Sequence, residues 1–485
     1  MLNSKSYQGI NEELNNYYSN GEKNIWRNNF HIEMPFGLIN DPNGLSYYDN
    51  KFHIFYQWNP FGCEHKTKHW GLIATTDFVN FTKPKIILKP EDWFDRNGCY
   101  SGCGVVKDDE LKLYYTGNVK GTNNERESYQ CLATYYRDGT IEKQGVVIQK
   151  QPDGYTSHFR DPFIFIRDNL YYMVLGVQTE ALKGKVLIYK SKDAVTWEVA
   201  GELKTNMRDF GYMWECPNMV KILDDKYAFI FSPQGLESEE FKYQNTYQSG
   251  YVIGELDIQN VQLKDHSEFK ELDMGFDFYA PQVFNHDNKN IMFGWIGMPD
   301  KDDEYPTYNQ GWMYALTIPR VLEYRNNELY QKPIDEIKNL RQEKVTNIKD
   351  LICGDYKLNL DSRCVEIILN LEICKTNFIE IKFKFNNEYI LLTYDKKAQV
   401  CTIDRRNMEQ GGKGIRKFKL KALEELKLHM FIDNSVIEIY YQEGLEVTTL
   451  MYFPKEEQLE IGITNDNKVK IIELSMWKLR SVKYE

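Results

Sequence analysis

The chain repeats one pattern five times between residues 30 and 325, and this regularity constrains its fold more than any other feature. Each copy reads as a short strand, a polar turn rich in Asp and Asn, and a second strand full of aromatic residues. At steps of 57 to 64 residues, the second strands begin near Phe52, Leu111, Leu170, Tyr227 and Ile291. A period this steady indicates a repeat architecture.

A β-unit of this size is too small to bury its own face, and five such sheets packed around an axis form a five-bladed β-propeller. The first strand of each blade lines the central channel, so residues at the same place in different repeats converge. Asp41, Asp161 and Glu215 stand 9 to 12 residues before the aromatic strand in the first, third and fourth repeats. We therefore expect these three acids to meet in one pocket.

The repeats end near residue 325 of 485, which leaves enough chain for a second domain. Beyond residue 345, short alternating apolar runs separated by polar turns predict a β-sandwich. The predicted fold is therefore all-β, a five-bladed β-propeller followed by a C-terminal β-sandwich. The predicted parts are an N-terminal arm (1–24), the propeller domain (25–325), a linker with a short helix (326–344) and the sandwich (345–485).

Composition excludes several classes of partner. The net charge of −11 and the lack of a basic stripe disfavour nucleic acid. No segment approaches 18 apolar residues, so no membrane span is expected. The nine Cys are scattered and odd in number, and the N-terminal residues have no apolar run of signal-peptide length, which favours a reducing cytoplasm. Cys99 and Cys103 lack a second pair at zinc spacing, so no metal site is predicted.

Each of the three acids also has a purely structural interpretation. Asp41 lies in NDPNG, a strong turn signal, although its place at the opening of the first repeat favours a nucleophile or a stabiliser of positive charge. Asp161 follows Arg160, which would keep it ionised by lowering its pKa, either in a pocket or in a surface ion pair. Glu215 has the apolar surroundings that suit a general acid, but it could also point outward from a strand.

An ordered series of motifs resembles glycoside hydrolase family 32, from about residue 30 to residue 322. The motifs are NDPNG, FYQWNP, HWG, YSG, FRDP, WECPN and YAPQ, followed by GWIGMPD and LTIPR. The resemblance implies a β-fructofuranosidase of the invertase and sucrose-6-phosphate hydrolase type. It also implies retention of configuration through a covalent intermediate, with no metal or organic cofactor required.

Carried over motif by motif, the resemblance implies a role for each acid. Asp41 would be the nucleophile, Glu215 the general acid/base and Asp161 the transition-state stabiliser, while Cys216 would adjust the acid/base. The positions that would contact the sugar are Asn40, Gln57, Trp70, Tyr100, Ser101, Arg160 and Trp295.

Several alternatives remain open on sequence alone. The same acids would support a fructan hydrolase or a fructosyltransferase, and a non-catalytic sugar-binding protein could share the fold. Sucrose-6-phosphate is the leading substrate, since an intracellular enzyme of this type meets sugar phosphorylated during uptake. The run from His65 to His69 could supply positive charge for the phosphate or could be a solvated turn. A homodimer through a sandwich edge is a further expectation.

Overall fold

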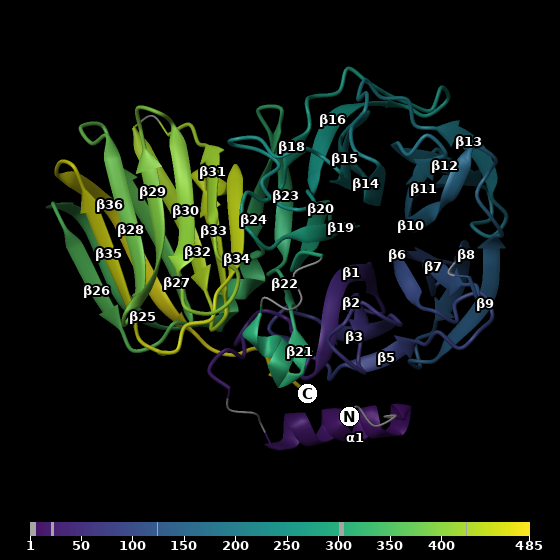
Figure 1. Cartoon of the computed structure of the whole chain (residues 1–485), viewed down its shortest axis with the longest axis horizontal. Coiled ribbons are helices and arrows are strands. Elements are labelled where there is room, and N and C mark those ends of the chain that lie inside the picture. Colours follow the sequence, from purple (N-terminus) through teal and green to yellow (C-terminus); the bar gives the residue numbers. More distant parts are fainter. Residues whose placement is uncertain (1–5, 21–23, 124, 300–304, 423) are drawn as a thin grey trace.

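The computed structural model describes residues 6–20, 24–123, 125–299, 305–422 and 424–485. In this part of the chain, five sheets surround a common axis and two further sheets lie beside them (Figure 1). The predicted all-β fold with a propeller and a C-terminal sandwich is thus confirmed. Residues 1–5 and 21–23 of the predicted N-terminal arm lie outside the described residues.

The strands of each blade pair antiparallel and run outward from the first strand, which a two-residue polar turn joins to the second. Blade one consists of β1 (Gly37–Tyr48), β2 (Lys51–Asn59), β3 (His69–Thr75), β4 (Asn80–Phe81) and β5 (Lys85–Leu88). Blade two consists of β6 (Cys99–Lys107), β7 (Glu110–Lys120), β8 (Arg126–Tyr135) and β9 (Ile141–Ile148). Blade three consists of β10 (Tyr155–Arg167), β11 (Leu170–Thr179), β12 (Gly184–Ser191) and β13 (Glu198–Glu202).

The remaining two blades close the ring. Blade four consists of β14 (Met213–Leu223), β15 (Lys226–Gln234), β16 (Gly250–Asp257), β17 (Gln262–Lys264) and β18 (Lys270–Glu271). Blade five consists of β19 (Tyr279–His286), β20 (Lys289–Ile296), β22 (Ala315–Leu316), β23 (Arg320–Arg325) and β24 (Glu328–Pro333). Between β20 and β22, η2 (Pro306–Gln310) leads into β21 (Trp312–Met313), which pairs parallel with β1 and so joins the last blade to the first.

The sandwich follows a single 3₁₀ turn. The short helix expected between the two parts is η3 (Asp335–Leu340), and the first sandwich strand begins directly after it. One sheet has the order β25 (Arg341–Cys353), β36 (Val469–Leu479), β27 (Val365–Glu372), β32 (Glu425–Ile432), β33 (Val436–Tyr441) and β34 (Glu446–Met451), with η4 (Gln442–Gly444) between the last two. The other has the order β26 (Tyr356–Leu360), β35 (Leu459–Asn465), β28 (Phe378–Phe385), β29 (Glu388–Asp395), β30 (Val400–Asn407) and β31 (Ile415–Lys419).

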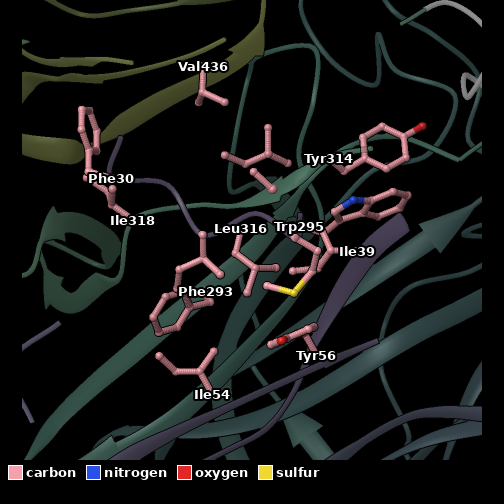
Figure 2. Packing of buried hydrophobic residues seen from close by; sticks show 14 of the residues in the cluster. Phe30, Ile39, Ile54, Tyr56, Phe293, Trp295, Tyr314, Leu316, Ile318 and Val436 are labelled. Carbon is pink, nitrogen blue, oxygen red and sulfur yellow. The ribbon is translucent and has the colours of Figure 1, made fainter. Parts of the chain in front are cut away.

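One apolar cluster connects the propeller to the rest of the chain. It combines side chains of blades one and five with Phe30 from the segment before β1 and Val436 from the sandwich (Figure 2). The N-terminal helix α1 (Tyr7–Asn20) adds Ile10 and Leu14 to the same cluster and lies on the outside of blade one. The C-terminal strand β37 (Lys483–Tyr484) pairs with β4 of that blade. The two ends of the chain therefore fasten blade one in place.

Within the described residues, no helix is both long and apolar enough to cross a membrane.

Candidate active site

A β-bulge interrupts the first strand of every blade at the same distance from the axis. In each first strand, two consecutive residues have no partner on the second strand, and regular pairing resumes directly after them. The unpaired residues are Asn40 and Asp41, Tyr100 and Ser101, Asp161 and Pro162, Cys216 and Pro217, and Ala280 and Pro281. A bulge turns side chains away from the regular alternation of a strand, and these five turn them toward one another.

Each of the three predicted acids lies at the bulge of its own strand, and their positions relative to the bulge are successive. Glu215 is the last paired residue before it, Asp161 is the first unpaired residue and Asp41 is the second. Residues at or next to all five bulges line a small cavity, with Asp161 among them. The equivalent positions in the repeats thus bring the acids together as predicted, although the three positions differ from one another by one residue each relative to the bulge.

Asp41 lies in a network of neutral hydrogen-bond donors. Its Oδ2 accepts from the Ser101 hydroxyl, to which the Gln57 amide donates in turn. Its Oδ1 accepts from the Asn40 amide at 3.0 Å, and that amide also donates to Gln57 at 2.9 Å. Lys68 Nζ donates to Asn40 Oδ1 at 2.7 Å. This network fixes the orientation of the Asp41 carboxylate from blade one and blade two.

Asp161 shares a sulfur neighbour with Asp41. The Cys216 thiol lies 3.8 Å from Oδ2 of each acid, and the Cys216 backbone N–H donates to Asp161 Oδ2 at 3.0 Å. Asp161 adopts a left-handed backbone conformation with φ of 64°, which is costly for a residue with a side chain. Its own backbone N–H is held by the Thr116 hydroxyl at 3.0 Å, so contacts from two neighbouring blades fix this conformation.

Glu215 receives three donors. Arg160 donates to Oε1 from Nε at 3.0 Å and from Nη2 at 2.6 Å. Gln234 and Tyr279 donate to Oε2 at 2.8 and 2.6 Å. The side chain of Glu215 is 17% exposed, compared with 7% for Asp161. The carboxylate is therefore oriented by blades three, four and five while it stays open to a ligand.

The expectation that Arg160 keeps Asp161 ionised through a lowered pKa is wrong, because the pKa is raised overall although the charge of Arg160 lowers it in part. The guanidinium turns to Glu215 and lies 3.9 Å from Asp161 Oδ2. Burial raises the pKa of Asp161 to about 7, since the attraction of Arg160 is too weak to offset burial and the charges of Glu215 and Asp41. Burial also raises the pKa of Asp41, against the hydrogen bonds from Ser101 and Asn40. Ionisation of both axial aspartates is thus opposed mainly by burial.

The predicted sugar-contacting residues fall into two groups. Asn40, Gln57, Ser101 and Arg160 belong to the hydrogen-bond networks of the acids, as described above. Trp70, Tyr100 and Trp295 border those networks and take no direct part in them. Trp70 is fully buried, and its indole N–H donates to the backbone oxygen of Tyr100 at 3.0 Å. Trp295 is 1% exposed and packs edge-on against Tyr314.

Sequence reasoning missed several residues of this site. Tyr279 stands at the same bulge position in blade five as Glu215 in blade four, so a stricter alignment of the repeats would have found it. Gln234 and His158 carry no comparable signal, because each becomes part of the site through the pairing or approach of neighbouring strands. Among the described residues, no group of three or more His, Cys, Asp or Glu is placed to hold a metal ion.

Known families and proteins resemble the chain over nearly its whole length. The model for the glycosyl hydrolases family 32 N-terminal domain matches residues 31–333, and the model for the family 32 C-terminal domain matches residues 329–478. A sucrose-6-phosphate hydrolase of Bacillus subtilis is 40% identical over 461 residues, which cover 93% of this chain and 94% of the relative. A Staphylococcus xylosus protein of the same name is 36% identical, with 94% and 93% covered.

Solved structures agree with this assignment. A sucrose-6-phosphate hydrolase from Lactobacillus gasseri superposes with a TM-score of 0.87 at 30% identity, covering 98% of this chain and 99% of that one. A Bombyx mori β-fructofuranosidase of the same family, determined in complex with sucrose, has a TM-score of 0.87 at 29% identity, and both chains are covered completely.

Proposed function

Because the chain belongs to glycosyl hydrolase family 32, we propose that it hydrolyses the β-fructofuranosidic bond of sucrose-6-phosphate and of sucrose and releases fructose. The observation that carries this proposal is the convergence of Asp41, Asp161 and Glu215 on the propeller axis. The names of the relatives with 36 to 40% identity support the same reaction. The chain is an enzyme of the glycosidase class, and its substrate is a small sugar.

In the proposed mechanism, Asp41 attacks the anomeric carbon of the fructosyl group. The hydrogen bonds from Ser101 and Asn40 orient its carboxylate, and preorganisation of this kind lowers the barrier of a displacement. The bond to the leaving oxygen breaks as the new ester bond forms. A water molecule then attacks the same carbon and frees Asp41, so that two displacements give net retention.

Glu215 is the proposed general acid and base. It protonates the leaving oxygen in the first displacement and removes a proton from the attacking water in the second. The Tyr279 hydroxyl, 2.6 Å from Oε2, can accept as well as donate. A protonated Glu215 therefore keeps this contact when the hydroxyl rotates. Arg160 remains on Oε1 in both protonation states.

Asp161 is the proposed transition-state stabiliser. Its carboxylate lies beside Asp41 and accepts from the Cys216 backbone, which leaves further lone pairs for the hydroxyls of the fructosyl ring. Positive charge develops on that ring in the transition state, and an adjacent carboxylate stabilises it. Asn40, Gln57, Ser101, Arg160, Tyr100, Trp70 and Trp295 are the proposed positions around the fructosyl group.

The test is the initial rate of fructose release from sucrose-6-phosphate, sucrose and inulin, with an Asp41→Asn control. We expect release from the first two and none from the control. Reaction in aqueous methanol should give methyl β-fructofuranoside, since the second displacement then takes methanol from the same face. Release from inulin alone would replace this proposal with a fructan hydrolase, and binding without turnover of any sugar would leave a sugar-binding protein.

We further propose a cytoplasmic location, which the nine free cysteines support. A homodimer would form through a free sandwich edge, because isologous contacts between sheet edges are a common route to dimers. Light scattering of the purified protein measures this directly.

A further inference from the structure

A basic cluster of Arg126 and His158 lies where β8 and β10 approach each other in blades two and three. Arg126 is the first residue of β8, and His158 precedes Arg160 by two positions on β10. The His158 Nδ1 atom lies 2.7 Å from Nη1 of Arg160 and 3.5 Å from Nη1 of Arg126. The cluster is therefore one side chain away from Glu215, which Arg160 also contacts.

The tautomer of His158 follows from its neighbours. A guanidinium has donors and no acceptor, so Nδ1 must accept from both arginines and the proton must lie on Nε2. Burial and the charges of Arg160 and Arg126 together lower the pKa of His158 to about 4. His158 is thus neutral at physiological pH. Its Nε2–H group has no partner among the described residues.

Arg126 has no carboxylate partner within the described part of the chain. The two acids beside it in sequence are engaged elsewhere, since Glu125 accepts from Asn123 and Glu127 accepts from Tyr129. Side chains alternate between the faces of a strand, which places Arg126 on the face toward β10 and Glu127 on the other. A half-buried guanidinium with unused donors is unusual in a chain with a net charge of −11.

The contact with Glu215 places the cluster relative to the two halves of the substrate. The fructosyl group occupies the side of Asp41 and Asp161, and Glu215 protonates the oxygen of the leaving group. The leaving glucosyl group must then extend beyond Glu215, toward the face of Arg160, His158 and Arg126. Its sixth carbon is only a few bonds from the protonated oxygen, so a phosphate on that carbon falls in this region.

We propose that Arg126 and His158 form the subsite that binds the 6-phosphate of the leaving glucosyl group. This inference rests on the proposed β-fructofuranosidase activity and names the residues that recognise the phosphorylated form of its substrate. Arg126 supplies a charged planar fork suited to phosphate oxygens, and His158 supplies one neutral donor. The run from His65 to His69 is the less suitable site, because Lys68 turns inward to Asn40 and His69 contacts Tyr7 on helix α1.

Two charge-neutralising variants test the subsite. Arg126→Gln removes the charge at the proposed site, and Lys66→Gln removes one at the exposed turn of blade one as a matched control. For each protein, kcat/KM is measured on sucrose-6-phosphate and on sucrose at constant ionic strength. We expect Arg126→Gln to lower the ratio of the two values about 10- to 100-fold, as for the loss of hydrogen bonds to a charged group, and Lys66→Gln to change it less than about twofold.

A second readout uses the product. Inhibition by glucose 6-phosphate should weaken in Arg126→Gln by a similar factor, and Arg126→Lys should restore part of it because the charge returns without the fork. Retention of the wild-type ratio in Arg126→Gln, or its loss in Lys66→Gln, would overturn the subsite while the proposed function stands. A wild-type protein that cleaves neither sugar would instead overturn the proposed function, and the subsite with it.

Discussion

Two groups of buried carboxylates lie in this molecule, one at the propeller axis and one between the propeller and the sandwich, and their surroundings differ. At the interface, Glu438 accepts from Arg320 at 2.7 and 3.1 Å and lies 3.0 Å from Nε2 of His31. Asp433 lies 2.9 Å from Nδ1 of the same histidine and accepts from four backbone N–H groups. Both interface acids contact a cation directly.

At the axis, the guanidinium of Arg160 contacts Glu215 directly, and the two aspartates lack such a partner. Asp41 accepts from the neutral groups of Ser101 and Asn40, and Arg160 turns from Asp161 to Glu215. The pKa values reflect this contrast. Burial opposes ionisation of Glu438, but Arg320 and His31 outweigh it and hold its pKa at about 2. For Asp161, burial prevails and raises the pKa to about 7.

The contrast separates stability from function. The interface acids use their lone pairs on protein donors, so that removing one of them would leave a buried cation with too few partners and destabilise the joined domains. The axial aspartates Asp41 and Asp161 keep lone pairs for substrate hydroxyls and for bond formation, and they repel one another while no substrate is bound. Perturbed carboxylates gathered in this way mark a reactive site, and their cost to stability is offset by packing such as that of the interface.

The largest effect should come from breaking the axial group. Asp41→Asn is expected to reduce kcat for fructose release by about 10⁴-fold or more, because loss of a nucleophile removes the covalent route. The melting temperature should stay equal or rise, since the amide removes a charge that burial and Glu215 disfavour. Calorimetry and sugar assays on one preparation measure both. Loss of activity together with unfolding would contradict the contrast.

The interface group should respond in the opposite way. Glu438→Gln removes one of two carboxylate partners from each of two buried cations, since Arg320 keeps Asp273 and His31 keeps Asp433. Removing one partner of a buried ion pair costs up to about 3–5 kcal/mol. Denaturant unfolding measures this loss. The kcat of the folded fraction should change less than about twofold, because Glu438 lies outside the hydrogen-bond networks of the axial acids. A variant that keeps its stability and loses activity would reverse the assignment.

The amino-acid sequence was sufficient to predict the axial group of acids, because that group depends on the repeats. The repeat of about 60 residues predicted the propeller, and the register of its strands brought Asp41, Asp161 and Glu215 together, since each first strand lines the axis. The bulges were not predictable, because a bulge depends on how two strands pair and not on composition. Arg160 illustrates the limit. Its neighbour in sequence is Asp161, yet its partner in space is Glu215.

The interface group was invisible in the sequence for a related reason. His31 and Asp433 are 402 residues apart and belong to segments with no shared period. A lone histidine in an apolar stretch gives no indication of its partners. Likewise, Arg126 stands between two glutamates in sequence, which suggests a solvated charged turn, and only the alternation of β8 directs it to the face of β10.

A pH titration of stability sharpens the comparison. Burial lowers the pKa of His31, but Asp433 and Glu438 outweigh it and raise the value to about 9, from an ordinary 6.5. A raised histidine pKa contributes stability that is complete below pH 6.5 and is lost as the pH rises through 9. We expect the wild-type melting temperature to fall over this range and His31→Gln to start lower and fall less. Equal slopes in both proteins would exclude His31 as the cause.

The smallest effect is expected from Asp161, and its sign is opposite to that of an interface acid. A raised carboxyl pKa means that the folded protein holds a proton which the unfolded chain releases, so stability declines as the pH rises from about 4 to 7. Asp161→Asn should therefore raise the melting temperature at pH 7.5 by a few degrees, on the order of 2–4 °C per kcal/mol, while it impairs catalysis. Asp433→Asn is the matched control at the interface. The pKa of Asp433 is lowered, because His31 outweighs the effect of burial. The Asp433→Asn variant should therefore have a lower melting temperature than the wild type at the same pH. A higher melting temperature in both variants would show that the pairing of the buried charge does not distinguish the two groups.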